Sequence, residues 1–190
     1  MKISAIVMAS GQSKRMGENK LFLDFKGKEL FVHTMDLLKD LDLDETIIVS
    51  SFDHVLDVAK DYGFKALFNN NPEVGKSTTI RLGTDAAKAD NALMYFVADQ
   101  PLLTLETCRK LIEAFDENQI ITYPVINDRR GAPVIFPASY REGLMNLEAD
   151  QGGMILAYGQ ENNRVDIDDE KELIDIDTIE AYNKIKEDYE

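Results

Sequence analysis

Strand-like and helix-like segments alternate along this chain, and that alternation limits its possible folds more than any other feature of the sequence. Two runs, residues 3–9 and 92–98, are largely apolar, as expected of strands covered on both faces. The pattern favours an α/β fold, namely a single Rossmann-like three-layer domain with a mostly parallel sheet over residues 1–190. We expect strands at residues 3–9, 45–50, 65–68, 92–98, 120–125, 134–136 and 173–176, and helices at 30–41, 54–62, 78–89, 105–115 and from 178.

A glycine-containing loop with basic side chains follows the first apolar run. Gly11 and Gly17 can adopt backbone conformations that other residues avoid, and exposed N–H groups with Arg15 and Lys20 would form a polyphosphate site. The loop is neither common phosphate-binding motif, because residue 13 is not glycine and Gly17 is not followed by lysine. A tight turn with solvated charges is the alternative interpretation.

Two aspartates stand at the ends of expected strands. Asp99 follows an apolar run and precedes Gln-Pro, which stops a strand sharply, so its carboxylate is suited to Mg²⁺. Its alternative role is to cap the next helix, but Thr104 is better placed for that. Asp177 is the natural second carboxylate, although it could equally cap the last helix, and Asp175 is a weaker candidate.

Residues 75–78 read Gly-Lys-Ser-Thr and reproduce the tail of a P-loop. The first glycine of that motif should fall at position 70, which is asparagine, so the match is incomplete. Ser77 and Thr78 are also natural caps for the start of a helix. Lys76 could reach a phosphate.

Six short motifs across the chain fit together as a set. Residues 9–20 read A-S-G-Q-S-K-R-M-G-E-N-K, and the other segments are 75–83, 97–101, 129–133, 150–153 and 175–182. In this order they resemble the motifs of nucleotidyltransferases of the molybdenum-cofactor type, the first of which is A-[AG]-G-x-S-x-R-M-G-x-x-K. The longer similarity lies with the cytidylyl branch of that family.

The resemblance implies a nucleotidyltransferase-type fold and transfer of CMP from CTP to the phosphate of molybdopterin, with release of pyrophosphate and with Mg²⁺ as cofactor. We expect residues 126–165 to contribute the acceptor side of the cleft. The implied catalytic residues are Arg15, Lys20 and Asp99, and the implied metal ligands are Asp99 and Asp177. The implied nucleotide-binding residues are Ala9, Ser10, Gly11, Arg15, Gly17, Lys20, Ser77, Thr78 and Thr79, and the acceptor-binding residues are Gln100, Arg130, Gly131 and Pro133.

Two departures from the family pattern bear on the substrates. Ser10 replaces the alanine of cytidylyl members and the glycine of guanylyl members, and Ala132 stands where the family usually has histidine. CTP is the expected nucleotide, with a guanylyltransferase of the same cofactor as one alternative. A sugar-phosphate or alcohol-phosphate nucleotidyltransferase and a non-catalytic cofactor-delivery protein are the others.

The charge balance narrows the range of partners. Thirty-five acidic and twenty-one basic residues give a net charge of −14, which opposes binding to nucleic acid or to anionic membranes. Cys108, the single cysteine, cannot form an internal disulfide and is expected to be buried. With no secretory signal and no apolar stretch of about 20 residues, we expect a cytoplasmic protein. The resemblance also allows for a transient contact with a molybdoenzyme.

Overall fold

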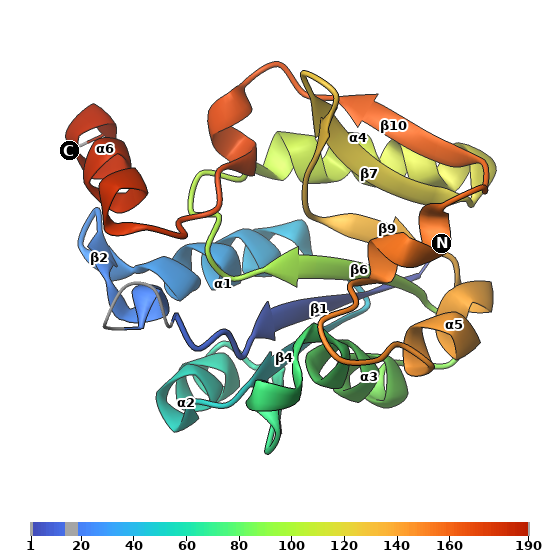
Figure 1. The fold of residues 1–190 in the computed structure, drawn as a ribbon, viewed down its shortest axis with the longest axis horizontal. Helices are drawn as coiled ribbons and strands as arrows, with labels where there is room; N and C mark the ends of the chain where they lie inside the picture. Colours follow the sequence, from blue (N-terminus) through green and yellow to red (C-terminus); the bar gives the residue numbers. More distant parts are fainter. Residues whose placement is uncertain (1, 14–18, 190) are drawn as a thin grey trace.

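An eight-stranded sheet forms the middle layer of the molecule (Figure 1). The computed structural model describes residues 2–13 and 19–189. The strands are β1 (Ile3–Ala9), β4 (Glu45–Ser50), β5 (Lys65–Phe68), β6 (Ala92–Val97), β7 (Ile121–Ile126), β8 (Arg129–Arg130), β9 (Val134–Phe136) and β10 (Asn162–Asp166). Their order is β10-β7-β9-β6-β1-β4-β5, with β8 beside β7. Only β8 and β9 run antiparallel to their neighbours, so the predicted mostly parallel sheet is confirmed.

Helices cover both faces of this sheet and complete the three layers (Figure 1). The α-helices are α1 (Leu30–Leu41), α2 (Asp53–Asp61), α3 (Lys76–Ala86), α4 (Leu105–Asn118), α5 (Arg141–Met145) and α6 (Ile179–Tyr189). Apolar side chains of α1, α2 and α4 form one core cluster with the sheet, and those of α3 and α5 form a second cluster. Burial of apolar side chains on both faces of the sheet stabilises its packing between the two layers of helices.

The central strands β1 and β6 show why their sequences are apolar throughout. Along β1, Ala5 and Val7 contribute to one core cluster, and Ile6 between them contributes to the other. Successive side chains of a strand point to opposite faces, so a strand with helices on both sides needs apolar residues at every position. β1 and β6 pair in parallel, and Val7 stands opposite Phe96.

The C-terminal part of the sheet differs from the sequence prediction. Residues 173–176 were expected to form the last strand, but this prediction is wrong, because a 3-10 helix covers Glu170–Leu173 and residues 174–189 contain no strand. The edge strand on the β7 side of the sheet is β10, which pairs in parallel with β7. The apolar side chains of Leu173 and Ile176 are buried although they lie outside any strand. Ile176 packs beside Phe25 and Tyr182.

A small hairpin and the last helix form a third apolar cluster. The hairpin consists of β2 (Asp24–Phe25) and β3 (Lys28–Glu29), and α6 packs on it. The Tyr182 hydroxyl donates a hydrogen bond to the Asp24 carbonyl oxygen at 2.6 Å. This packing holds the C-terminal segment beside the chain that follows the first loop.

Cys108 is buried in α4, as predicted, and burial raises the pKa of its thiol to about 12. Thr104 caps that helix, because its side chain accepts a hydrogen bond from the Thr107 N–H. Over residues 2–13 and 19–189, none of the helices combines the length and the apolar character that crossing a membrane would require.

Candidate active site

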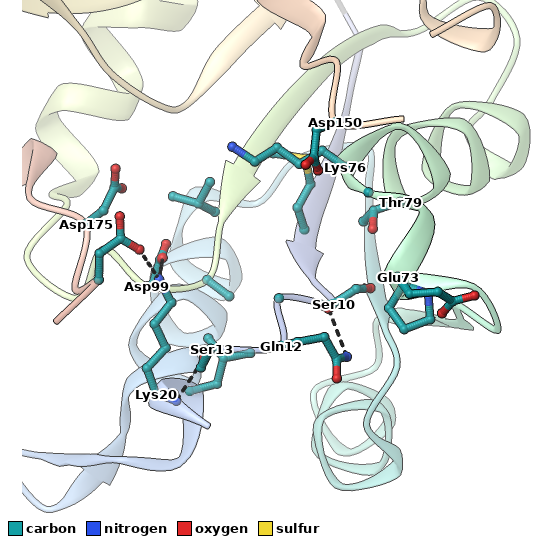
Figure 2. Close-up of a pocket in the computed structure, with 18 residues that line it drawn as sticks. Ser10, Gln12, Ser13, Lys20, Glu73, Lys76, Thr79, Asp99, Asp150 and Asp175 are labelled. Atoms are coloured by element: carbon teal, nitrogen blue, oxygen red, sulfur yellow. Dashed lines mark hydrogen bonds and ion pairs between the residues drawn. The ribbon is translucent and has the colours of Figure 1, made fainter. Parts of the chain in front are cut away.

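A cavity of about 430 Å³ opens where β1 and β6 end (Figure 2). These two parallel strands end at the same edge of the sheet, which is where open α/β sheets bind their ligands. Of the residues implied by the sequence motifs, the cavity is lined by Ser10, Gly11, Lys20, Thr79, Asp99 and Asp177. The structure therefore brings residues from the two ends of the chain and from its middle to one place.

The loop after β1 forms one wall of the cavity. Ser10 anchors its start by donating a hydrogen bond from its hydroxyl to the Val49 carbonyl oxygen at 3.3 Å. The Ser13 hydroxyl accepts a hydrogen bond from the Lys20 backbone N–H at 3.1 Å, which ties together the two described sides of the loop. A Cβ atom on Gly11 would meet nothing within 4 Å, so the backbone there is open to a ligand.

Other loop residues of the implied set cannot be placed in the same way. Arg15 and Gly17 lie outside the described residues. Ala9 is the last residue of β1 and is buried in the core, so it supports the loop and does not line the cavity.

Lys20 joins two of the implied carboxylates. Its ammonium group forms ion pairs with Asp99 Oδ2 and with Asp177 Oδ1, the latter at 2.6 Å. The Lys20 and Asp99 side chains are only 12% and 14% exposed, whereas Asp177 is 60% exposed. Burial alone would lower the pKa of Lys20, but the two carboxylates outweigh it and raise that pKa above its usual value.

Asp175 lies beside this ion-pair cluster on the C-terminal segment (Figure 2). Burial, followed by the negative charges of Asp99 and Asp177, raises the pKa of its carboxyl group to about 6. The segment is held in place by the Ile176 N–H, which donates to the Asp99 carbonyl oxygen at 3.1 Å. Asp175, which the sequence favoured less as a metal ligand, thus lies next to Asp99 and Asp177, the two candidates that it favoured more.

Gln100 contacts Asp175 and helps to hold it in this arrangement. It is buried, its side-chain amide donates to Asp175 Oδ1 at 2.9 Å, and it does not line the cavity. Its side-chain oxygen has no hydrogen-bond partner among the described residues.

The carboxylates suit a divalent cation that takes most of its ligands from elsewhere. Among the described residues, no group of three or more Asp, Glu, His or Cys side chains is arranged to enclose a metal ion. Mg²⁺ in phosphate-transfer sites needs only one or two carboxylates, with phosphate oxygens and water as the other ligands. Asp99 and Asp177 meet that requirement, because both already contact one cationic group.

The first turn of α3 forms the other side of the cavity, and only part of it faces inward. Lys76 and Thr79 line the cavity, as residues three positions apart on a helix share a face. Ser77 is fully buried, and Thr78 borders a separate surface cavity of about 490 Å³. The expectation that the three hydroxyl residues all contact the nucleotide is therefore supported by position for Thr79 alone.

Gly75 lets the start of α3 pack against the loop that carries Asp150. Its φ angle is +120°, and a Cβ atom there would lie 2.6 Å from the backbone of Ala149. Only glycine fits both the backbone conformation and this close approach. The contact places Asp150 in the wall of the cavity.

The residues implied for the acceptor lie outside the cavity itself. Arg130 is exposed on β8, and its guanidinium group lies 5.3 Å from the centre of the Tyr158 ring. Gly131 packs against Leu173, and Pro133 immediately precedes β9. β8 pairs with the carboxyl end of β7, so these residues stand at the same edge of the sheet as the cavity but do not line it.

Sequence reasoning missed several residues that line the cavity. Gln12, Ser13 and Asp150 fall inside motifs that were recognised, so their positions carried a usable signal. Glu73 sits in a 3-10 turn before α3, and nothing in its sequence neighbourhood marks it as a wall residue.

Comparisons with known proteins agree with this geometry. The sequence profile of the MobA-like NTP transferase domain matches residues 5–164. A probable molybdenum cofactor guanylyltransferase of Pyrococcus horikoshii is 28% identical over 64% of this chain and 60% of its own length. The purine catabolism protein PucB of Bacillus subtilis is 25% identical over 95% of this chain and 94% of its own length. The match with the guanylyltransferase therefore spans about three fifths of that relative.

Two solved structures share the fold. A nucleotidyl transferase from Methanothermobacter superposes with a TM-score of 0.82 at 21% identity, covering 99% of this chain and 97% of its own. The Rv0371C protein of Mycobacterium tuberculosis in complex with manganese superposes with a TM-score of 0.83 at 18% identity, covering 98% and 99% of the two chains.

Proposed function

The chain belongs to the MobA-like NTP transferase family, and from this premise we propose that it transfers a nucleoside monophosphate from a nucleoside triphosphate to the phosphate of a molybdopterin-type acceptor. The observation that carries the proposal is the cluster of Lys20, Asp99 and Asp177 beside the open loop after β1. A phosphate-binding loop next to carboxylates that suit a divalent cation is what nucleotidyl transfer requires.

In the proposed reaction the acceptor phosphate attacks the α-phosphorus of the nucleotide, and pyrophosphate leaves. An acceptor phosphate is already ionised at neutral pH, so the site needs no general base. The loop backbone, with Lys20 and Arg15, holds the triphosphate, and catalysis consists of positioning and neutralisation of charge.

We propose Asp99 and Asp177 as the ligands of the metal cofactor, with Mg²⁺ as the ion. A bound divalent ion would neutralise developing negative charge on the phosphates. The manganese complex of the Mycobacterium tuberculosis protein supports a divalent ion on this fold, and the pair of carboxylates supports its location.

CTP is the proposed nucleotide, on the similarity of the motifs at residues 97–101 and 129–133 to the cytidylyl branch. GTP is the second candidate, because a curated relative carries the name of a guanylyltransferase. Both nucleotides would use the same loop and the same carboxylates, so the cavity supports either.

Calorimetric titration with CTP, GTP, UTP and ATP in the presence of Mg²⁺ tests the proposal. We expect metal-dependent binding of CTP by the wild type, with binding weakened at least tenfold in Asp99→Asn, because loss of a charge-assisted contact costs about 1.5–3 kcal/mol. A preference for GTP would move the assignment to the guanylyl branch. A preference for UTP or ATP would favour a sugar-phosphate acceptor, and no binding of any triphosphate would refute the proposed function.

A further inference from the structure

Lys76 is a cation in the cavity wall that no described carboxylate holds. Lys20, by contrast, is paired with both Asp99 and Asp177. Among residues 2–13 and 19–189, no ion pair to Lys76 is formed, and its side chain is exposed. Its ammonium group is therefore available to an anionic ligand.

The position of Lys76 directs it into the cavity. It is the first residue of α3, and Figure 2 shows its side chain extending from the helix toward the side of the cavity where β6 ends. Thr79 lies one turn further along the same face and is almost fully buried. Its hydroxyl oxygen accepts a hydrogen bond from Asn69 Nδ2 at 3.1 Å, which leaves the O–H free to donate to a ligand.

The described wall of the cavity contains more acidic than basic residues, so the positive charge of Lys76 matters for binding a phosphate group. Among the described wall residues there are two lysines, and one of them is already shared between carboxylates. The acidic residues of the wall outnumber them, namely Glu73, Asp99, Asp150, Asp175 and Asp177. The described part of the wall alone thus carries net negative charge, which an unpaired cation and a metal ion would offset for an entering phosphate group.

We propose that the Lys76 ammonium group, with the Thr79 hydroxyl, binds the α-phosphate of the nucleotide. The inference rests on the proposed function, and it takes the reacting α-phosphate to lie next to the proposed metal ligand Asp99. Lys76 extends toward that site from the opposite side of the cavity, so the phosphate is held between the metal ion and this lysine. Lys76 thereby becomes a third cationic contact, beside Lys20 and Arg15, and the one directed at the phosphorus that reacts.

Calorimetric titration of four proteins tests the inference: wild type, Lys76→Met, Lys76→Arg and Lys110→Met. Lys110 is a matched control, because it is an exposed helical lysine whose partner is Glu106 and which does not line the cavity. The probes are CTP, GTP, CMP, GMP and pyrophosphate, each with Mn²⁺. Lys76 is exposed, so the variants should fold, and circular dichroism verifies this.

We expect Lys76→Met to bind the preferred triphosphate and its monophosphate about tenfold more weakly, the loss typical of one charge-assisted hydrogen bond. Pyrophosphate affinity should not change, because it has no α-phosphate. Lys76→Arg should retain most of the affinity, and Lys110→Met should match the wild type.

Equal binding of triphosphate by Lys76→Met and wild type would overturn the inference. A loss for the triphosphate and for pyrophosphate, but not for the monophosphate, would overturn the assignment to the α-phosphate. These results are distinct from failure of the proposed function, in which the wild type itself binds no triphosphate.

Discussion

At Lys20, one ammonium group occupies the space between two carboxylates that are also the proposed metal ligands. Two unit charges 4 Å apart interact by about 4 kcal/mol at an effective dielectric constant of about 20, so this lysine opposes a divalent ion that arrives alone. We expect Lys20→Gln to bind Mn²⁺ at least tenfold more tightly than wild type in the absence of nucleotide. Titration followed by electron paramagnetic resonance of free Mn²⁺ measures this affinity.

Lys76→Gln is the matched control for that experiment. It removes the same charge from the same cavity but contacts neither Asp99 nor Asp177. Its effect on Mn²⁺ affinity should be much smaller. Mn²⁺ binding by Lys20→Gln that is equal to or weaker than that of the wild type would show that the lysine does not compete with the ion.

Individual site residues could be predicted from the sequence to different degrees. The position of Asp99 just beyond the end of a strand was predictable, because a short-range signal, an apolar run cut off by Gln-Pro, marks that end. The pairing of Lys20 with Asp177 was not predictable, because it joins two ends of the chain that are brought together by the packing of α6 on the β2–β3 hairpin. Motif matching also could not separate Thr79 from Ser77, since the orientation of the helix decides which hydroxyl faces the cavity.

At the scale of elements, the join between α3 and the loop at residues 149–150 determines the shape of one cavity wall. We expect Gly75→Ala to lower the free energy of unfolding by about 1–3 kcal/mol, because alanine is strained at a positive φ and its Cβ would overlap the Ala149 backbone. It should also weaken triphosphate binding, because relief of the overlap moves the start of α3. Urea denaturation and calorimetry measure the two effects.

Gly152→Ala is the comparison for this variant, since a Cβ at Gly152 meets nothing within 4 Å and its φ is −94°. It should be close to neutral in both measurements. If Gly152→Ala lost as much stability and triphosphate affinity as Gly75→Ala, the effect would come from reduced backbone flexibility. The close approach of Gly75 to Ala149 would then not be its cause.

Elements were predictable where local pattern and tertiary burial agree. Residues 30–41 have an apolar stripe at helical spacing, and α1 has the predicted bounds. The prediction of a strand at residues 173–176 was wrong because local pattern and tertiary burial disagree there. The apolar residues of this segment are buried in loop contacts, whereas the observed edge strand β10 is mostly polar. An edge strand exposed to solvent needs no apolar run, so its sequence carries little signal.

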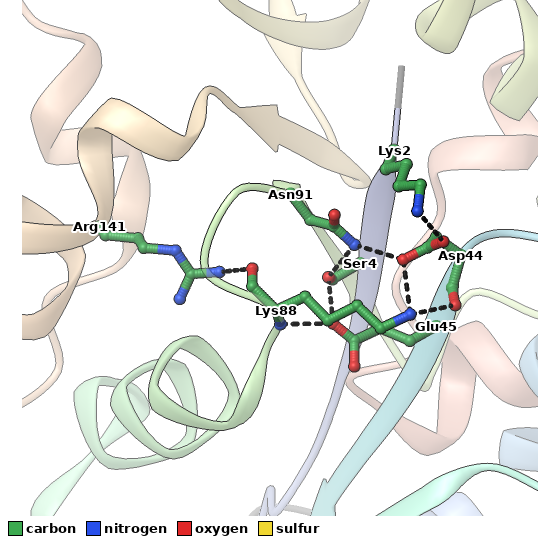
Figure 3. A network of polar contacts seen from close by, with 7 residues as sticks. All are labelled: Lys2, Ser4, Asp44, Glu45, Lys88, Asn91 and Arg141. Atoms are coloured by element: carbon green, nitrogen blue, oxygen red, sulfur yellow. Dashed lines mark hydrogen bonds and ion pairs between the residues drawn. The ribbon is translucent and has the colours of Figure 1, made fainter.

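At the scale of the whole molecule, the carboxyl ends and the amino ends of the parallel strands carry different features. The carboxyl edge carries the cavity, and the opposite edge carries a polar network around Asp44 (Figure 3). Asp44 accepts from Lys88 Nζ at 2.7 Å and from Asn91 Nδ2 at 2.9 Å, and it forms an ion pair with Lys2 at 3.6 Å. The network joins the starts of β1 and β4 to the loop after α3, so it should affect stability without affecting ligand binding.

The titration of Asp44 makes the contribution of this network to stability measurable as a function of pH. Hydrogen bonds from Lys88 and then Asn91 lower the pKa of its carboxyl group to about 2 from the ordinary value of 3.8. A group with a depressed folded-state pKa stabilises the fold above its unfolded-state pKa and loses that contribution as the pH falls through the folded-state value. We therefore expect Asp44→Asn to be less stable than wild type above about pH 4, with the difference disappearing toward about pH 2.

Urea denaturation from pH 2 to pH 7 measures this difference, and Lys88→Met provides a second route to it. Because Lys88 is the main cause of the lowered pKa, its removal should reduce the same pH-dependent contribution, while Lys110→Met should leave it intact. Both network variants should bind triphosphate as the wild type does, since neither Asp44 nor Lys88 lines the cavity. A difference between Asp44→Asn and wild type that stays constant down to pH 2 would show that the aspartate acts through packing and not through its charge.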